Sequence, residues 1–227
     1  MHRTDDPAGI GTRESLLDAA EELFSERGIP AASLRAITER AAANLAAVNY
    51  HFGSKQGLVL AVFDRRLAPL NRERLALLER CEVEKGSVED VVRAFIGPVF
   101  RTAREAHAGM GAFAQMMARA YSEPSDEVRE IFASQFSEVI DRFAAALARR
   151  LPGLPEEEIF WRLLFVAGAM AHTVSCGHLL ASYSRGRCSV SQPEEAIDHL
   201  VTFLAAGLEA PAPGPDTAPT KKSRRGH

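Results

Sequence analysis

Residues 33–52 read SLRAITERAAANLAAVNYHF, and this stretch decides the fold. Leu34, Ile37 and Ala41 recur at intervals of three and four residues, which places them on one face of a helix. After a short break, a second helix begins at Leu45. Two short helices joined by a tight turn form a helix-turn-helix, whose second helix fits the major groove of DNA. The stretch therefore predicts a DNA-binding head.

Helical periodicity continues on both sides of this stretch, and no segment alternates with the period of two expected of a strand. Before it, a helix is expected at residues 12–27, and the polar face of this helix carries Glu14, Asp18, Glu21 and Glu22. After it, a long helix should begin at a cap on Ser54 and end near residue 80. Further helices are expected at residues 88–106, 109–121, 126–151, 155–183 and 192–208. The predicted fold class is all-α.

Bulk composition limits the partners of the chain. Its 227 residues suffice for a buried core, and 46% hydrophobic with 25% charged residues is typical of a globular protein. The net charge is −3, so the positive charge that meets DNA has to be local. We find neither a signal peptide nor an apolar run of about 18 residues, and we expect a cytoplasmic protein without a membrane span.

The sequence offers no catalytic or metal-binding constellation. Cys81, Cys176 and Cys188 are widely spaced and form no CxxC pair, which favours free thiols over a disulfide framework or a zinc ribbon. His172 and Cys176 share a helical face, but His178 lies off it, so satisfied core or interface histidines are the preferred interpretation. We expect no enzyme activity, no metal and no cofactor.

The second helix of the head presents small and polar side chains outward. Ala46 and Ala47 let the backbone approach the bases, and an alanine methyl can contact a thymine methyl. Lys55 lies with Ser54 at the start of the fourth helix, where free N–H groups favour a phosphate. The alternative is a three-helix packing unit in which Tyr50, His51 and Phe52 are core residues.

The whole stretch from Leu16 to Phe63 resembles the TetR family of bacterial regulators, from the alanine-rich first helix to the YHFGSK junction. The resemblance implies that Ser33, Tyr50, His51 and Lys55 hold phosphates, and that Arg35, Leu45, Ala46 and Ala47 lie at base-contacting positions. Arg35 is the one residue there that can bind a guanine with two hydrogen bonds. The predicted DNA-binding set is Ser33, Arg35, Asn44, Leu45, Ala46, Ala47, Asn49, Tyr50, His51 and Lys55.

Two positions depart from the family pattern. The family usually has glycine where Ala42 stands, and an alanine in a turn that needs a positive φ costs about 1 kcal/mol. It usually has tyrosine where Asn49 stands, and Asn49 is therefore a candidate for reading a base rather than a phosphate. Beyond the head, residues 67–70 and 157–180 resemble the PsrA-type branch, which responds to fatty acids.

The second half of the chain is rich in side chains that suit an apolar ligand, although an ordinary helix-bundle core would use the same residues. Arg119 and Arg162 are candidates to bind a carboxylate, against the alternative of structural salt bridges. The predicted ligand-binding set is Phe95, Phe113, Met116, Met117, Arg119, Phe136, Arg162 and Phe165. Small residues allow close helix packing, and they predict a dimer interface at Ala167, Gly168, Ala171, Ser175 and Ala205.

Four segments follow from these patterns. Residues 12–56 form the DNA-binding domain and residues 57–209 the domain for ligand binding and dimerisation, while residues 1–11 and the tail 210–227 are expected to be disordered. We expect a homodimeric repressor that a small hydrophobic effector, such as a fatty acid or acyl-CoA, releases from a palindromic operator. The alternative is a helical interaction or structural protein with a vestigial helix-turn-helix.

Overall fold

The computed structural model describes residues 7–105, 113, 116–117, 126–177 and 179–213, and all regular structure in this part is helical. The all-α fold class is confirmed. The helices are α1 (Pro7–Arg27), α2 (Leu34–Arg40), α3 (Leu45–Phe52), α4 (Lys55–Val83), α5 (Val88–Glu105), α7 (Asp126–Arg150), α8 (Glu156–Cys176), α9 (Leu179–Tyr183) and α10 (Pro193–Glu209).

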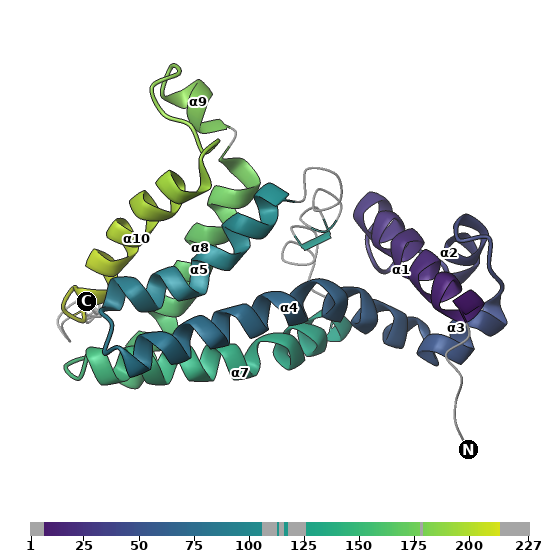
Figure 1. The fold of residues 1–227 in the computed structure, drawn as a ribbon, viewed down its shortest axis with the longest axis horizontal. Helices are drawn as coiled ribbons and strands as arrows, with labels where there is room; N and C mark the ends of the chain where they lie inside the picture. The colour runs from purple at the N-terminus through teal and green to yellow at the C-terminus, as the bar shows by residue number, and fades with distance from the viewer. Residues whose placement is uncertain (1–6, 106–112, 114–115, 118–125, 178, 214–227) are drawn as a thin grey trace, which may run out of the picture.

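Helices α1 to α3 form a head at one end of the molecule, and α4 leads from it into the body (Figure 1). In the body, α7 lies alongside α4, while α5, α8 and α10 run obliquely to this pair. The short helix α9 projects beyond the body. This arrangement places the helix-turn-helix at the far end of a long helix whose other end is packed in the body.

Helix α4 contributes side chains to two hydrophobic clusters. The head cluster joins residues of α1 to α3, such as Phe24 and Val48, to Val62 and Phe63 of α4. The body cluster contains Leu78 of α4 with residues of α5, α7, α8 and α10. The first turns of α4, which lie beyond the predicted domain boundary at residues 56 and 57, are thus part of the head core.

Two predicted helix limits differ from the structure. Helix α1 begins at Pro7 instead of residue 12, so residues 7–11 are helical and not disordered as expected. The helix expected at 155–183 is broken after Cys176. After this helix, a Cβ atom on Gly177 would come within 2.8 Å of Val190 Cγ2, so the returning chain requires glycine at this position. Most of the helix expected at 109–121 lies outside the described residues.

A group of ion pairs joins α1 to α4. Glu21 is only 3% exposed, although its position predicts a polar outer face. Its carboxylate accepts hydrogen bonds from Arg65 Nη2 at 2.6 Å and from Arg66 Nη2 at 2.8 Å. Arg65 also pairs with Asp18 at 2.8 Å and Glu14 at 3.3 Å. Because α4 crosses the acidic face of α1, this face becomes a junction between the two helices.

We predict that Glu21→Gln destabilises the head. The substitution keeps the shape but removes the charge that two guanidinium groups share, and the partners are only partly buried, so we expect a loss of about 2 kcal/mol. Urea unfolding measures the change. Glu22→Gln, on a neighbouring carboxylate that is 60% exposed, is the matched control and should change stability by less than about 0.5 kcal/mol. Equal effects of the two variants would contradict a special role for Glu21.

Candidate DNA-binding interface and ligand-binding body

Three helices, α2, α3 and α4, each begin at a short polar side chain that caps the helix: Ser33, Asn44 and Ser54. Ser33 Oγ accepts a hydrogen bond from Ala36 N at 3.2 Å, and Asn44 Oδ1 accepts one from Ala47 N at 2.9 Å. Ser54 caps α4 in the same way. Each cap satisfies a backbone N–H that has no partner within its helix. Ser33 and Asn44, predicted to meet DNA, therefore also define where α2 and α3 begin.

The turn between α2 and α3 is closed by backbone hydrogen bonds. Ala42 has φ of +49°, as expected for this position of the turn. Ala43 N donates to Thr38 O at 2.9 Å and Ala42 N donates to Glu39 O at 3.3 Å, which is the pattern of a Schellman motif. The left-handed residue ends α2 and directs the chain into α3. The turn thus orients the second helix despite the alanine.

One side of α3 is open to solvent. Val48 is fully buried, whereas Leu45, Ala46 and Asn49 are exposed and Tyr50 is 74% exposed. Tyr50 is therefore not a core residue, which contradicts the packing-unit alternative at this position. The eight residues of α3 include no Asp or Glu, so its surface does not repel a phosphate backbone.

The last two residues of α3 are less exposed than Tyr50. His51 is half-buried with its ring against the edge of Tyr50, at a centroid distance of 4.9 Å. Phe52 is half-buried below the guanidinium of Arg13, 5.5 Å from its ring centroid. Arg35 is exposed on α2, on the chain just after the Ser33 cap. The predicted DNA-facing residues thus lie on adjoining parts of α2 and α3.

Lys55 has a partner that the sequence does not reveal. Its Nζ donates to Ile29 O at 2.7 Å and to Pro30 O at 3.3 Å, in the loop that joins α1 to α2. The ammonium group thus ties the start of α4 to this loop. Its contact with a DNA phosphate stays a prediction.

The predicted ligand-binding residues separate into two groups. Phe95 lies in the body cluster, with its ring 5.0 Å from that of Phe143. The head cluster contains or contacts four others of the predicted ligand-binding set: Phe113, Met116, Met117 and Phe136. Phe63 of α4 contacts Phe113 edge-on, at a centroid distance of 6.1 Å. Arg119 lies outside the described residues.

The prediction that Arg162 binds a ligand carboxylate is wrong. Its Nε donates to Glu158 Oε1 at 2.9 Å, and its Nη1 donates to the carbonyls of Leu208 and Ala210 at 2.6 Å each. Arg162 thus holds the end of α10, whose last carbonyl groups lack partners within the helix. Its donors are used by the protein. The salt-bridge alternative was correct.

Helix α8 is apolar on two sides. Leu163 and Val166 pack in the body cluster, while Trp161, Leu164 and Phe165 are exposed on the other side. Phe165 is 61% exposed, so its predicted place in an interior ligand site is wrong. Within the described part of the chain, α8 alone is long and apolar enough to span a membrane by length and composition. The sequence FWRLLF shows this pattern, because apolar residues fall on both sides of the helix. A helix that is apolar on two sides is expected to pack against a second partner.

Four of the five predicted dimer residues are on α8 and are exposed or half-buried: Ala167, Gly168, Ala171 and Ser175. Ala205 is an error, because it is 3% exposed and packs in the body cluster. The side of α10 that carries Ala205 packs toward α5. The exposed side of α10 carries Phe203 instead, which is 73% exposed.

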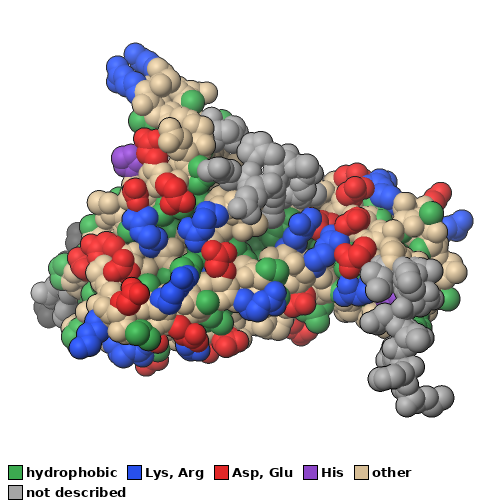
Figure 2. Space-filling view, viewed as in Figure 1, with side chains coloured by type: hydrophobic (Ala, Val, Ile, Leu, Met, Phe, Trp, Pro, Cys, Tyr) green, Lys and Arg blue, Asp and Glu red, His purple; other side chains and the backbone are tan. Residues whose placement is uncertain are grey.

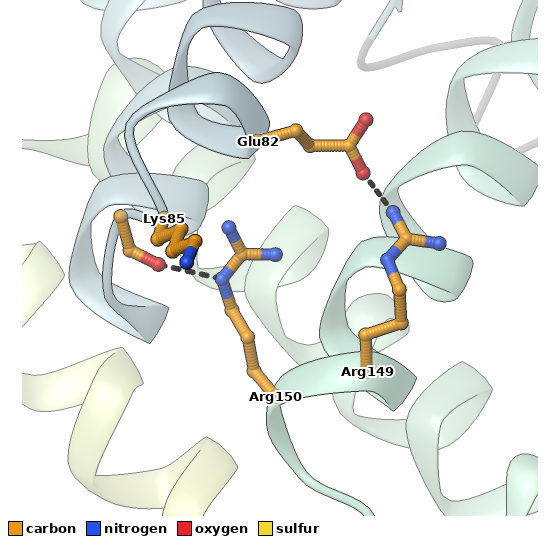
Figure 3. A pocket seen from close by; sticks show the side chains of 5 residues that line it. Glu82, Lys85, Arg149 and Arg150 are labelled. Atoms are coloured by element: carbon orange, nitrogen blue, oxygen red, sulfur yellow. Dashed lines mark hydrogen bonds and ion pairs between the residues drawn. The ribbon is translucent and has the colours of Figure 1, made fainter.

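A surface cavity of about 530 Å³ lies where α4 and α7 end, lined by Glu82, Lys85, Gly86, Arg149 and Arg150 (Figure 3). Arg149 pairs with Glu82, and Arg150 donates to Gly86 O at 2.7 Å and to Ala146 O at 3.0 Å. Arg150 also donates to Cys81 O at 3.3 Å, so its guanidinium joins the last turns of α4 and α7. On the face seen in Figure 2, basic and acidic side chains intermingle over the body. The positive charge of this face is not gathered into one patch.

An exposed helix α3 without acidic residues follows a turn closed by hydrogen bonds, and a helical body lies behind it; this is the geometry of a helix-turn-helix protein. Residues 16–62 match the model of bacterial regulatory proteins of the tetR family, and residues 93–207 match that of the tetracyclin repressor-like C-terminal domain. The chain belongs to the TetR family of DNA-binding transcriptional regulators, which is a family of regulators and not of enzymes.

Individual relatives agree over the head. An HTH-type transcriptional repressor of Mycobacterium tuberculosis is 45% identical over 58 residues, which are 26% of this chain and 31% of the repressor. The regulator TtgW of Pseudomonas putida is 39% identical over 59 residues, 26% of this chain and 44% of its own length. The match thus covers less than half the length of either relative.

Solved structures share the whole fold. The fatty acid degradation regulator FadR of Bacillus halodurans has a TM-score of 0.63 at 13% identity, covering 91% of this chain and 98% of its own. FadR of Bacillus subtilis, in complex with stearoyl-CoA, has a TM-score of 0.63 at 14% identity, with 86% and 98% covered. The SmeT–triclosan complex has a TM-score of 0.60 at 24% identity, with 92% and 99% covered. These likenesses show the fold.

We predict that Arg35→Ala lowers affinity for the operator by about 1–3 kcal/mol and relaxes the preference at one base pair, because it removes a bidentate contact with guanine. Fluorescence anisotropy measures binding to the best duplex that the wild-type protein selects from a random library, and to random duplex. Arg72→Ala, which removes the same charge from an exposed site on α4, is the control. Equal losses on both duplexes would show that Arg35 contacts only the backbone.

Proposed function

We propose that this protein is a ligand-controlled repressor that acts in the cytoplasm. Two heads of a homodimer bind the two half-sites of a palindromic operator, and a small hydrophobic effector in the body releases them. The observation that carries this proposal is the shared packing around Phe63. This side chain lies in the head cluster, yet it contacts Phe113 and Phe132, whose rings are centred 6.1 Å and 5.7 Å away.

The packing around Phe63 would couple effector binding in the body to operator binding by the head. Phe132 lies in the second turn of α7, and the centroid of its ring is 5.9 Å from that of Phe136. A ligand that repacks these aromatic side chains has to move Phe63 with them, because protein interiors are dense and do not deform freely. Since Phe63 is part of the head core, the head then changes its position relative to the body. The ligand and the operator would favour different positions, which is the requirement for coupling.

The dimer is proposed from the outer faces of α8 and α10. Large apolar side chains are exposed on both helices: Trp161, Leu164 and Phe165 on α8, and Phe203 on α10. Monomeric proteins rarely expose large apolar patches. A two-fold axis would bury the same surface of both copies against each other. A palindromic operator requires that the two heads of such a dimer lie on one side of the assembly.

We predict that Phe203→Lys converts the dimer into a monomer, because the new charge would be buried in the interface without a partner. Sedimentation velocity at micromolar concentration measures the state. Val83→Lys, which places the same charge on a side chain that is 85% exposed at the end of α4, should leave the dimer intact. A monomeric wild-type protein would contradict the proposed interface.

The proposed effector is a long-chain acyl compound. The resemblance of residues 67–70 and 157–180 to the PsrA-type branch supports it, as does the density of aromatic and methionine side chains between Phe95 and Phe136. The shared fold with FadR, a regulator of fatty acid degradation, is further support. The triclosan complex of SmeT is a reason to include a non-acyl hydrophobic compound in any test.

We predict that such an effector raises the melting temperature and loosens the operator complex together. At a concentration one hundred times its Kd, a ligand that binds only the folded state adds about 2.7 kcal/mol. A thermal-shift series of saturated and unsaturated chains, below their micelle concentrations, is read beside anisotropy of labelled operator. If only an aromatic compound such as triclosan has both effects, the acyl proposal is wrong, while the proposal of a ligand-controlled regulator remains.

A further inference from the structure

The solvent-exposed side of α3 is formed by four neighbouring residues. Val48 is fully buried, and the four residues on the other side of the helix are exposed: Leu45, Ala46, Asn49 and Tyr50. At about 100° per residue, these four positions span an arc of about 140° around the helix axis. Asn49 lies within this arc, between Leu45 and Ala46. A recognition helix meets the bases of the major groove with such a surface.

This surface lacks the side chains that read a G·C base pair. Two hydrogen bonds to guanine require arginine or lysine, and an acidic side chain accepts from cytosine, but none of these occurs among the eight residues of α3. The hydroxyl of Tyr50 both donates and accepts, so it does not distinguish one base pair from another. His51 is half-buried and lies outside the arc. Recognition of G·C therefore has to come from another element, as predicted for Arg35 on α2.

Asn49 carries the groups that read adenine. An asparagine amide accepts a hydrogen bond from N6 of adenine and donates one to N7. Asn44 uses its amide oxygen within the protein, because it accepts from Ala47 N at 2.9 Å and caps α3. The amide of Asn49 is exposed and forms no hydrogen bond within the part of the chain that the structure describes. Both of its hydrogen-bonding groups are thus available to a base.

The residues on either side of Asn49 in the arc are apolar. Leu45 is 50% exposed at the first position of α3, and Ala46 follows it. Thymine presents a methyl group in the major groove, and apolar side chains contact this group. Because thymine pairs with adenine, the apolar residues and the amide favour the same kind of base pair.

We infer that α3 selects A·T base pairs in each half-site, and that Asn49 is the residue that reads adenine. The inference rests on the proposed function, because it names base pairs that the proposed operator contains. Asn49 binds N6 and N7 of one adenine, while Leu45 and Ala46 contact the methyl groups of neighbouring thymines. The guanine predicted for Arg35 lies outside this A·T segment, because Arg35 belongs to α2.

The experiment changes single groups of the DNA. The full-length protein selects duplexes from a random library, and each adenine and thymine in one half-site of the best duplex is then replaced in turn. 7-Deazaadenine lacks the N7 acceptor and deoxyuridine lacks the methyl group of thymine, while both keep Watson–Crick pairing. Fluorescence anisotropy measures the affinity for each duplex.

We expect one adenine in the half-site at which 7-deazaadenine weakens binding at least about ten-fold, as the loss of a bidentate base contact does. At a thymine of the same half-site, deoxyuridine should weaken binding about four-fold, the effect of one methyl group that is no longer buried.

Variants assign these effects to residues. Asn49→Ala should bind the unmodified duplex about ten-fold more weakly and should no longer respond to 7-deazaadenine, since alanine has no amide. Gln56→Ala is the matched control, because it removes an exposed amide from the first turn of α4, and it should keep the full response. Leu45→Ala should reduce the response to deoxyuridine alone. Circular dichroism verifies folding, and the scan with wild-type protein decides if a variant does not fold.

The inference is overturned if no adenine of the half-site responds to 7-deazaadenine, or if the response persists in Asn49→Ala. Tolerance of deoxyuridine at every thymine would contradict the contacts of Leu45 and Ala46. Selection of duplexes without a responsive adenine would remove this inference alone. If the protein enriches no duplex from the library, the proposed function fails as well.

Discussion

The ion pairs between α1 and α4 fix the head on the long helix that carries it. Glu21 is shared by Arg65 and Arg66, at 2.6 Å and 2.8 Å. A carboxylate buried without these partners would be strongly unfavourable, so α1 and α4 cannot separate or slide without breaking both pairs. The position of α3, which packs on α1 and α4, depends in turn on this junction. The recognition helix is therefore placed by a helix that also reaches the body.

The same helix carries buried side chains of two kinds, one aromatic and one charged. Phe63 stands among the aromatic side chains near the head, and Arg74 lies three helical turns farther along α4 in the body core. Since both residues belong to one continuous helix, their displacement would be transmitted to the head without an intervening loop.

Local signals in the sequence were sufficient for much of the head. Ser54 was expected to cap the long helix, and its side chain does accept a hydrogen bond from Gly57 N. The positive φ expected of Ala42 follows from the tight turn and is present. The errors at Arg162 and Ala205 concern long-range contacts. The end of α10 that Arg162 holds, at Ala210, lies 48 residues away along the chain, so no local pattern reveals the contact.

The sequence by itself determined the all-α fold, the helix-turn-helix and the family, because these depend on periodicity, caps and turns that act within a few residues. Only the tertiary structure decided which side of each helix meets another. It buried Glu21 beneath two arginines, turned Ala205 inward while leaving Phe203 outside, and placed Arg74 in the body core. The physical reason is that burial and ion pairing depend on the angle at which helices cross, and residues far apart in the chain jointly set that angle.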